Sequence, residues 1–221
     1  MKSNIFKIYI AAVALAGVAS VLAALYDGRI GDPAGLLGYL VLTLVASAIK
    51  ARIPGIEGTV SLGFVGVLVG VATMSLCETV LVVTAAAVAQ TLWRSGPRPK
   101  AVQVIFNIGA LAASTWLSYT VAYALASDSP GLRIAVAVTP LYLCNVGLVA
   151  GLLSVISTGS LNAIWQKFQF TVFPCYLVGA LLSLAILQAR VLAPGWAIQL
   201  PMLGLSYLTF NTYRSWMRRL A

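Results

Sequence analysis

The chain has 221 residues, of which 61% are hydrophobic and 9% are charged, and its mean hydropathy is +0.97. Soluble domains are about half apolar, so this composition excludes a water-soluble monomer and predicts an all-α integral membrane protein. Fourteen Lys and Arg against five Asp and Glu give a net charge of +9, and His is absent. Without His, the commonest general base and most zinc sites are missing, so we expect no enzyme, no metal site and no cofactor.

Charged residues, Pro and Gly divide the chain into about eight apolar segments, each near the length of about 20 residues that a membrane-spanning helix needs. The first is too long for the apolar part of a signal peptide, so we interpret it as a span. The predicted spans of this single helical domain, 1–221, are 5–26, 33–51, 59–74, 78–93, 102–126, 132–156, 170–192 and 196–216. Residues 59–93 leave almost no room for a turn between two full helices, so a re-entrant hairpin and a total of six or seven spans stay open.

The basic residues predict the orientation, because Lys and Arg gather in cytoplasmic loops. With both termini inside, three basic residues fall outside, namely Arg29, Arg133 and Arg190. The eleven on the cytoplasmic side are Lys2, Lys7, Lys50, Arg52, Arg94, Arg98, Lys100, Lys167, Arg214, Arg218 and Arg219. This asymmetry predicts a multi-pass protein of the bacterial inner membrane with both termini cytoplasmic. Its positive charge then faces the anionic lipid bilayer, and no nucleic acid is needed as a partner.

Two local patterns predict packing. Small residues recur every four positions at Ala12, Ala16, Ser20 and Ala24, which makes a smooth helix face for another helix of this chain or of a partner. Glu78 lies where the fourth span begins, so we expect it to cap that helix. On that interpretation, Glu78→Gln costs only about 0.3–1 kcal/mol, the value of a charge at a helix terminus.

Polar side chains are costly in hydrocarbon and therefore point to function. Four amides lie near the predicted cytoplasmic boundary and could form one inward-opening cluster: Gln90, Gln103, Asn107 and Asn211. The alternative is structural, since such amides also join helices by hydrogen bonds worth about 1 kcal/mol. A second group lies nearer the midplane and comprises Thr139, Pro140, Tyr142 and Asn145; there Pro140 frees a carbonyl for Ser, Thr or water. As ligand-binding or coupling residues we predict Gln90, Gln103, Asn107 and Asn145.

Residues 160–169, SLNAIWQKFQ, place Leu161, Ile164, Trp165 and Phe168 on one helical face and polar side chains on the other. This pattern is typical of a short helix at the membrane surface.

Several stretches together resemble a known family. They are RIPGIEGTVSLGFV from Arg52, the acid Glu78, QTLW at 90–93, RPKAVQVIFN at 98–107, FPCYLVGA at 173–180 and TYRSWMRRL at 212–220. The chain resembles the multispan N-terminal membrane region of bacterial HD-type phosphohydrolase and GGDEF diguanylate cyclase signalling proteins. In those proteins a catalytic domain follows the last span, whereas this sequence ends at Ala221, so we do not carry over their cyclic-dinucleotide chemistry.

The chain is more distantly similar to the substrate-binding S component of energy-coupling-factor vitamin transporters. From these features we predict a stand-alone sensory or ligand-binding module that recognises a small apolar or amphipathic compound and acts through a separate membrane or cytoplasmic protein. The alternatives are an S-component-like transporter subunit and a structural accessory subunit of a larger membrane complex.

Overall fold

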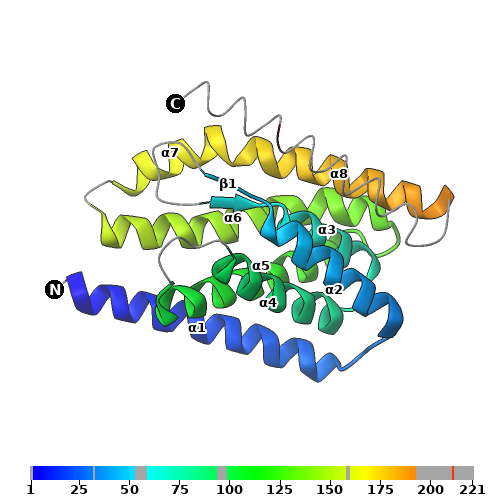
Figure 1. The fold of residues 1–221 in the computed structure, drawn as a ribbon, viewed down its shortest axis with the longest axis horizontal. Coiled ribbons are helices and arrows are strands. Elements are labelled where there is room, and N and C mark those ends of the chain that lie inside the picture. Colours follow the sequence, from blue (N-terminus) through cyan, green and yellow to red (C-terminus); the bar gives the residue numbers. More distant parts are fainter. Residues whose placement is uncertain are drawn as a thin grey trace.

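The structure is a computed structural model that describes residues 2–31, 33–52, 59–93, 99–157, 160–192 and 211. Its helices are α1 (Lys2–Asp27), α2 (Pro33–Ala48), α3 (Gly63–Thr73), α4 (Leu76–Leu92), α5 (Ala101–Leu125), α6 (Pro130–Ile156), α7 (Leu161–Thr171) and α8 (Phe173–Leu192). Strands β1 (Lys50–Arg52) and β2 (Thr59–Ser61) form an antiparallel hairpin with Ala51 opposite Val60. The described chain is thus a helical bundle with one small hairpin (Figure 1).

Within the described residues, four helical segments are long and apolar enough to cross a membrane: Asn4–Asp27, Ala101–Leu125, Pro130–Ile156 and Leu161–Ala189. The prediction of a helical membrane protein is confirmed at this level. The prediction of a full third span at 59–74 is wrong, because its first three residues form β2 and α3 has only 11 residues. A helix of that length rises about 16 Å, roughly half the hydrocarbon thickness.

Of two further predicted spans, the second is corrected and the eighth lies almost wholly outside the described residues. The predicted second span at 33–51 ends as a helix at Ala48 and continues into β1. The predicted eighth span, 196–216, lies outside the described residues except for Asn211. Eight full-length spans are therefore not found in the part of the chain that the structure describes.

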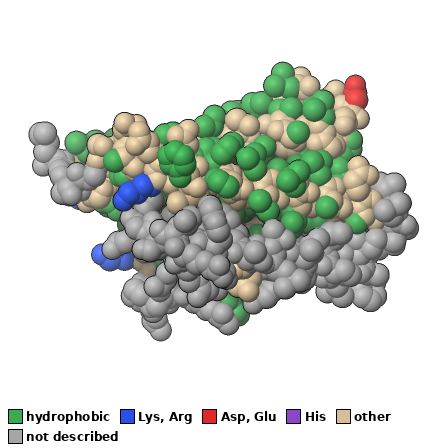
Figure 2. All heavy atoms as spheres, turned by 90° about the horizontal axis from the view of Figure 1, so that it is seen from above, with side chains coloured by type: hydrophobic (Ala, Val, Ile, Leu, Met, Phe, Trp, Pro, Cys, Tyr) green, Lys and Arg blue, Asp and Glu red, His purple; other side chains and the backbone are tan. Residues whose placement is uncertain are grey.

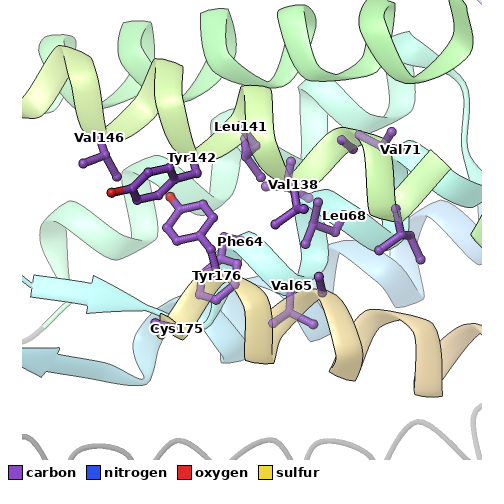
Figure 3. Packing of buried hydrophobic residues seen from close by; sticks show 14 of the residues in the cluster. Phe64, Val65, Leu68, Val71, Val138, Leu141, Tyr142, Val146, Cys175 and Tyr176 are labelled. Atoms are coloured by element: carbon purple, nitrogen blue, oxygen red, sulfur yellow. The ribbon is translucent and has the colours of Figure 1, made fainter. Parts of the chain in front are cut away.

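Helix α3 forms the centre of the bundle. Nine of its 11 residues are buried, because the sequence GFVGVLVGVAT provides no polar face that could meet water. Its side chains Phe64, Val65 and Leu68 pack with residues of α6 and α8, including Leu141 and Tyr176 (Figure 3). A short helix can hold this position because the neighbouring helices, rather than lipid, surround it.

Helices α1 and α5 cross at two glycines. A Cβ at Gly17 would overlap the Cα of Gly109, and a Cβ at Gly109 would lie 2.8 Å from the Val13 carbonyl oxygen. Of the predicted small-residue stripe, Ser20 and Ala24 are buried within the bundle. Ala12 and Ala16, its other two members, are exposed. The close approach at Gly17 turns α1 so that Val13, Gly17, Ser20 and Ala24 form its buried face.

Glu78 caps α4, as predicted, and also holds a neighbouring loop. Its carboxylate accepts a hydrogen bond from the Ser75 amide at 2.9 Å. It also accepts one from the Gly31 amide at 3.0 Å, between α1 and α2. The Ser75 hydroxyl lies 2.6 Å from the carbonyl of Arg29. The loop after α1 is therefore fastened to the turn between α3 and α4.

The two ends of the bundle differ in charge. Helices α1, α5 and α7 begin at the end of the bundle that carries the hairpin (Figure 1). Helix α4 ends there too, since Lys50 Nζ of the hairpin donates to the Trp93 carbonyl at 2.6 Å. The described lysines at this basic end are Lys7, Lys50, Lys100 and Lys167. The opposite end carries Asp27, Glu78 and Asp128 together with Arg29 and Arg133. In Figure 2 basic side chains lie at one end of the visible face, an acidic one at the other, and apolar side chains between them.

Helix α7 confirms the predicted helix at 160–169 but not its separation from the next span. Phe168 is buried, and Ile164 and Trp165 are partly buried, whereas Leu161 is 52% exposed. Only Val172 separates α7 from α8, whose first residue is Phe173. The apolar face of α7 thus packs on the bundle and leads directly into α8.

Candidate functional site

A cavity of about 90 Å³ lies beneath the hairpin toward the basic end of the bundle. Seven helices or strands and one helix junction supply its wall: β2, α3, α4, α5, α6, α7, α8 and Val172 between α7 and α8. The buried half-helix α3 makes room for it, because the chain enters α3 from β2 and not from a longer helix. The site therefore forms where the regular helical packing is interrupted, as binding sites in membrane bundles commonly do.

Among the residues that the structure describes, the wall is mostly apolar and contains no Lys, Arg, Asp or Glu. Its apolar residues are Val60, Phe64, Leu111, Val146, Val149, Phe168 and Val172. Its polar residues are Thr59, Ser61, Gln90, Asn145 and Tyr176. An apolar wall with a few convergent polar groups is the usual composition of a small-molecule site.

Asn145 and Tyr176 form the best-defined polar pair of the site. Asn145 Nδ2 donates to the Tyr176 hydroxyl at 2.9 Å, which joins α6 to α8. The Tyr176 ring stacks on Phe64 with a centroid distance of 4.6 Å. Phe64 in turn lies on Gly179, where any Cβ would overlap its ring. The pair is thus held by packing from α3 and α8 (Figure 3).

Gln90 approaches the cavity from α4, two residues before the helix ends. Its side-chain amide has no hydrogen-bond partner among the described residues, although it is partly buried. A primary amide carries two donor hydrogens and an acceptor oxygen. Gln90 therefore has hydrogen-bonding capacity to offer a molecule in the cavity.

Of the predicted site residues, the structure brings together Gln90 and Asn145 and leaves the other two outside. Gln103 Oε1 accepts from the Lys100 amide at 2.9 Å and so caps the start of α5. Asn107 Nδ2 donates to Thr91 Oγ1 at 3.0 Å, which joins α5 to α4. These contacts favour the structural interpretation for Gln103 and Asn107. Asn211 is exposed, and its flanking residues lie outside the described part.

Asn107→Leu is therefore expected to destabilise the protein without changing the cavity. The variant loses one interhelical hydrogen bond, which in membrane proteins is worth about 1 kcal/mol, and leaves Thr91 bonded to the carbonyl of Ala87. Unfolding by denaturing detergent in reconstituted bilayers measures this loss. Unchanged stability would show that the Asn107 amide exchanges its bond to Thr91 for water.

The second predicted group is only partly assembled. Thr139 is exposed, whereas Tyr142 is buried in an aromatic cluster with Trp165, Phe173 and Tyr176 at centroid distances of 5.0–5.9 Å. Near Pro140, the Ser118 hydroxyl donates to the Ala137 carbonyl at 2.8 Å. A serine of α5 thus supports α6 one residue after Val136, whose carbonyl would pair with the N–H that Pro140 lacks, so the predicted partner of that freed carbonyl stays a prediction.

Sequence reasoning missed Phe64, Tyr176 and the hairpin residues of the wall. Phe64 and Tyr176 sit in apolar stretches where an aromatic residue signals only packing, and β2 lies within what reads as a span. The spacing of Phe64 after Gly63 and before Gly66 was the available signal, since glycines mark places where side chains of other helices come close.

No family model, no curated protein and no solved structure matches this chain. The resemblance to signalling and vitamin-transport membrane regions therefore stays a prediction. In the described ranges no three His, Cys, Asp or Glu side chains lie together in a way that could hold a metal ion.

Proposed function

We propose that this protein is a membrane ligand-binding module that receives a small molecule in the cavity beneath the β1–β2 hairpin and acts through a separate protein. The observation that carries the proposal is the meeting of two membrane-embedded amides, Gln90 and Asn145, in one apolar cavity. Polar side chains in membrane helices are costly and mark functional sites by default. Here Gln90 lacks a hydrogen-bond partner among the described residues, and the side chain of Asn145 makes one hydrogen bond and keeps its carbonyl oxygen as an acceptor.

The cavity also supports a way to transmit binding. Its wall joins α3, α4, α6 and α8, so a ligand that contacts Gln90 and Asn145 bridges helices on opposite sides of α3. A ligand shifts an arrangement only by binding one state more tightly than another. By bridging them, a ligand favours the arrangement in which these helices lie close together. A partner protein that contacts the basic ends of the helices senses this change of arrangement.

The first test is retention of small molecules and proteins during purification into lipid nanodiscs, followed by mass spectrometry. We expect a bound compound with the wild type, its loss in Asn145→Leu and its retention in Asn107→Leu, which removes the same amide outside the cavity. A co-purifying signalling enzyme supports the sensory function, and an ATPase pair with a scaffold subunit supports the transporter subunit. Equal retention by Asn145→Leu and the wild type contradicts the proposed site.

We further propose that the basic end faces the cytoplasm of a bacterial inner membrane and that both termini lie there. The separation of Lys7, Lys50, Lys100 and Lys167 from the acidic residues supports this orientation through the positive-inside rule. Three described segments then lie at the outer side: the loop after α1, the turn between α3 and α4 that Glu78 joins to it, and the turn around Asp128.

A reporter that is active only in the periplasm tests this orientation. We expect activity when it is inserted next to Asp128, and none when it follows Lys100 or Ala221. Reporter activity after Lys100 would show that the orientation is the reverse of the proposed one. Activity after Ala221 but not after Lys100 would show that the number of membrane crossings is odd.

A further inference from the structure

The wall of the cavity constrains the charge of what it binds. Among the described residues it contains no ionised side chain, and Lys50, a basic residue of the hairpin, directs its ammonium to the Trp93 carbonyl. Moving an ion from water into a low-dielectric site costs several kcal/mol unless an opposite charge or several hydrogen bonds replace its hydration. The described residues of the wall offer an anion no cation and a cation no carboxylate, so this part of the wall favours an uncharged molecule.

The polar groups of the wall provide both donors and acceptors. Asn145 donates one amide hydrogen to the Tyr176 oxygen, and its side-chain carbonyl oxygen remains available as an acceptor. The Tyr176 hydroxyl, having accepted that bond, keeps its own hydrogen as a donor. The Gln90 amide brings a second donor and acceptor. A ligand group that is complementary to these side chains has a hydrogen-bond donor and an acceptor side by side, as an amide, a lactam or a cyclic urea does.

Size and shape restrict this group further. A dry engineered cavity of about 150 Å³ holds benzene, so a cavity of about 90 Å³ accepts a smaller ring or the head of a larger molecule. Phe64 and Phe168 provide flat apolar surfaces, and the Tyr176 ring stacks on the first of them. A small planar group with apolar faces and a polar edge fits this wall.

We propose that the cavity selects uncharged ligands through an amide-type group, with Gln90 and Asn145 pairing with its edge and the apolar residues of the wall covering its faces. This inference rests on the proposed ligand-binding function and specifies its chemical class. A site built around hydrogen bonds rejects analogues that lack the matching donor, because its own polar groups then stay unpaired.

Four probes of similar size test the selection in nanodiscs by ligand-observed NMR titration. They are 2-pyrrolidone, a lactam; cyclopentanone, which lacks the N–H donor; pyrrolidine, a cation at pH 7; and cyclopropanecarboxylate, an anion. We expect 2-pyrrolidone to bind about tenfold or more tightly than each of the other three, the effect of one satisfied hydrogen-bonding group or one uncompensated charge.

Variants connect the selection to the cavity. Gln90→Leu and Asn145→Leu are each expected to weaken 2-pyrrolidone binding about tenfold and to reduce its advantage over cyclopentanone, whereas Asn107→Leu leaves both unchanged. A thermal unfolding scan of each preparation confirms that the variants are folded, and Tyr176→Phe, which keeps the ring, gives a second test that removes only the hydroxyl.

The outcomes separate the two proposals. Binding of cyclopentanone or a charged probe as tight as that of 2-pyrrolidone, still weakened by Asn145→Leu, overturns the selection for amides and leaves the cavity as a ligand site. Absence of 2-pyrrolidone binding overturns the selection as well. The proposed function fails separately, when in addition the nanodisc preparation retains no compound that Asn145→Leu releases.

Discussion

Gly17→Ala is expected to lower the free energy of unfolding by about 2–3 kcal/mol, because the new methyl group would occupy the place of the Gly109 Cα. Backbone atoms form this contact, and they cannot rotate away as a flexible side chain can. The two long helices α1 and α5 must therefore separate or slide. The result is measured by unfolding the purified protein in mixed micelles, with the wild type in the same preparation.

Gly38→Ala provides the matched control. Gly38 also lies within a helix, α2, but a Cβ there meets no atom within 4 Å. Its replacement is expected to leave stability unchanged or to raise it by up to about 1 kcal/mol, since Ala favours helices over Gly. Equal effects of the two substitutions would show that α1 does not cross α5 at Gly17.

Glu78→Gln is expected to cost about 2–3 kcal/mol, more than the value that follows from helix capping alone. The carboxylate accepts hydrogen bonds from two backbone amides, on two different segments. The Gln side chain keeps one acceptor oxygen and places an NH₂ group against a donor, so at least one of these partly buried amides loses its partner. Hydrogen exchange at Gly31 should also accelerate, because this amide would then be free to exchange.

The exposed acid Asp128 at the same end of the bundle serves as the comparison. Asp128→Asn removes one negative charge there as well, but its contact is a hydrogen bond from the neighbouring Ser127 at the surface. We expect a change within about 0.5 kcal/mol. If Glu78→Gln cost no more than Asp128→Asn, the fastening of the loop after α1 would not contribute to stability.

The candidate site could be predicted only in part. Gln90 and Asn145 stand out in the sequence because an amide in an apolar helix is costly wherever it points. Gln103 and Asn107 stand out for the same reason, yet their amides bond to a helix start and to Thr91. Periodicity shows that a residue lies on a helix face, but the rotation of that helix against its neighbours decides which partner it meets.

By itself the sequence determined that the chain is helical and made for a membrane, that Glu78 caps α4, and that basic and acidic residues separate along the chain. Each of these follows from composition or from contacts within a few residues. Only the tertiary structure decided that α3 is a buried half-helix, that Gly17 rather than Ala16 faces α5, and that Tyr176 meets Asn145. In a chain that is apolar on nearly every face, hydrophobicity cannot orient a helix, and close contacts between glycines and a few hydrogen bonds do so instead.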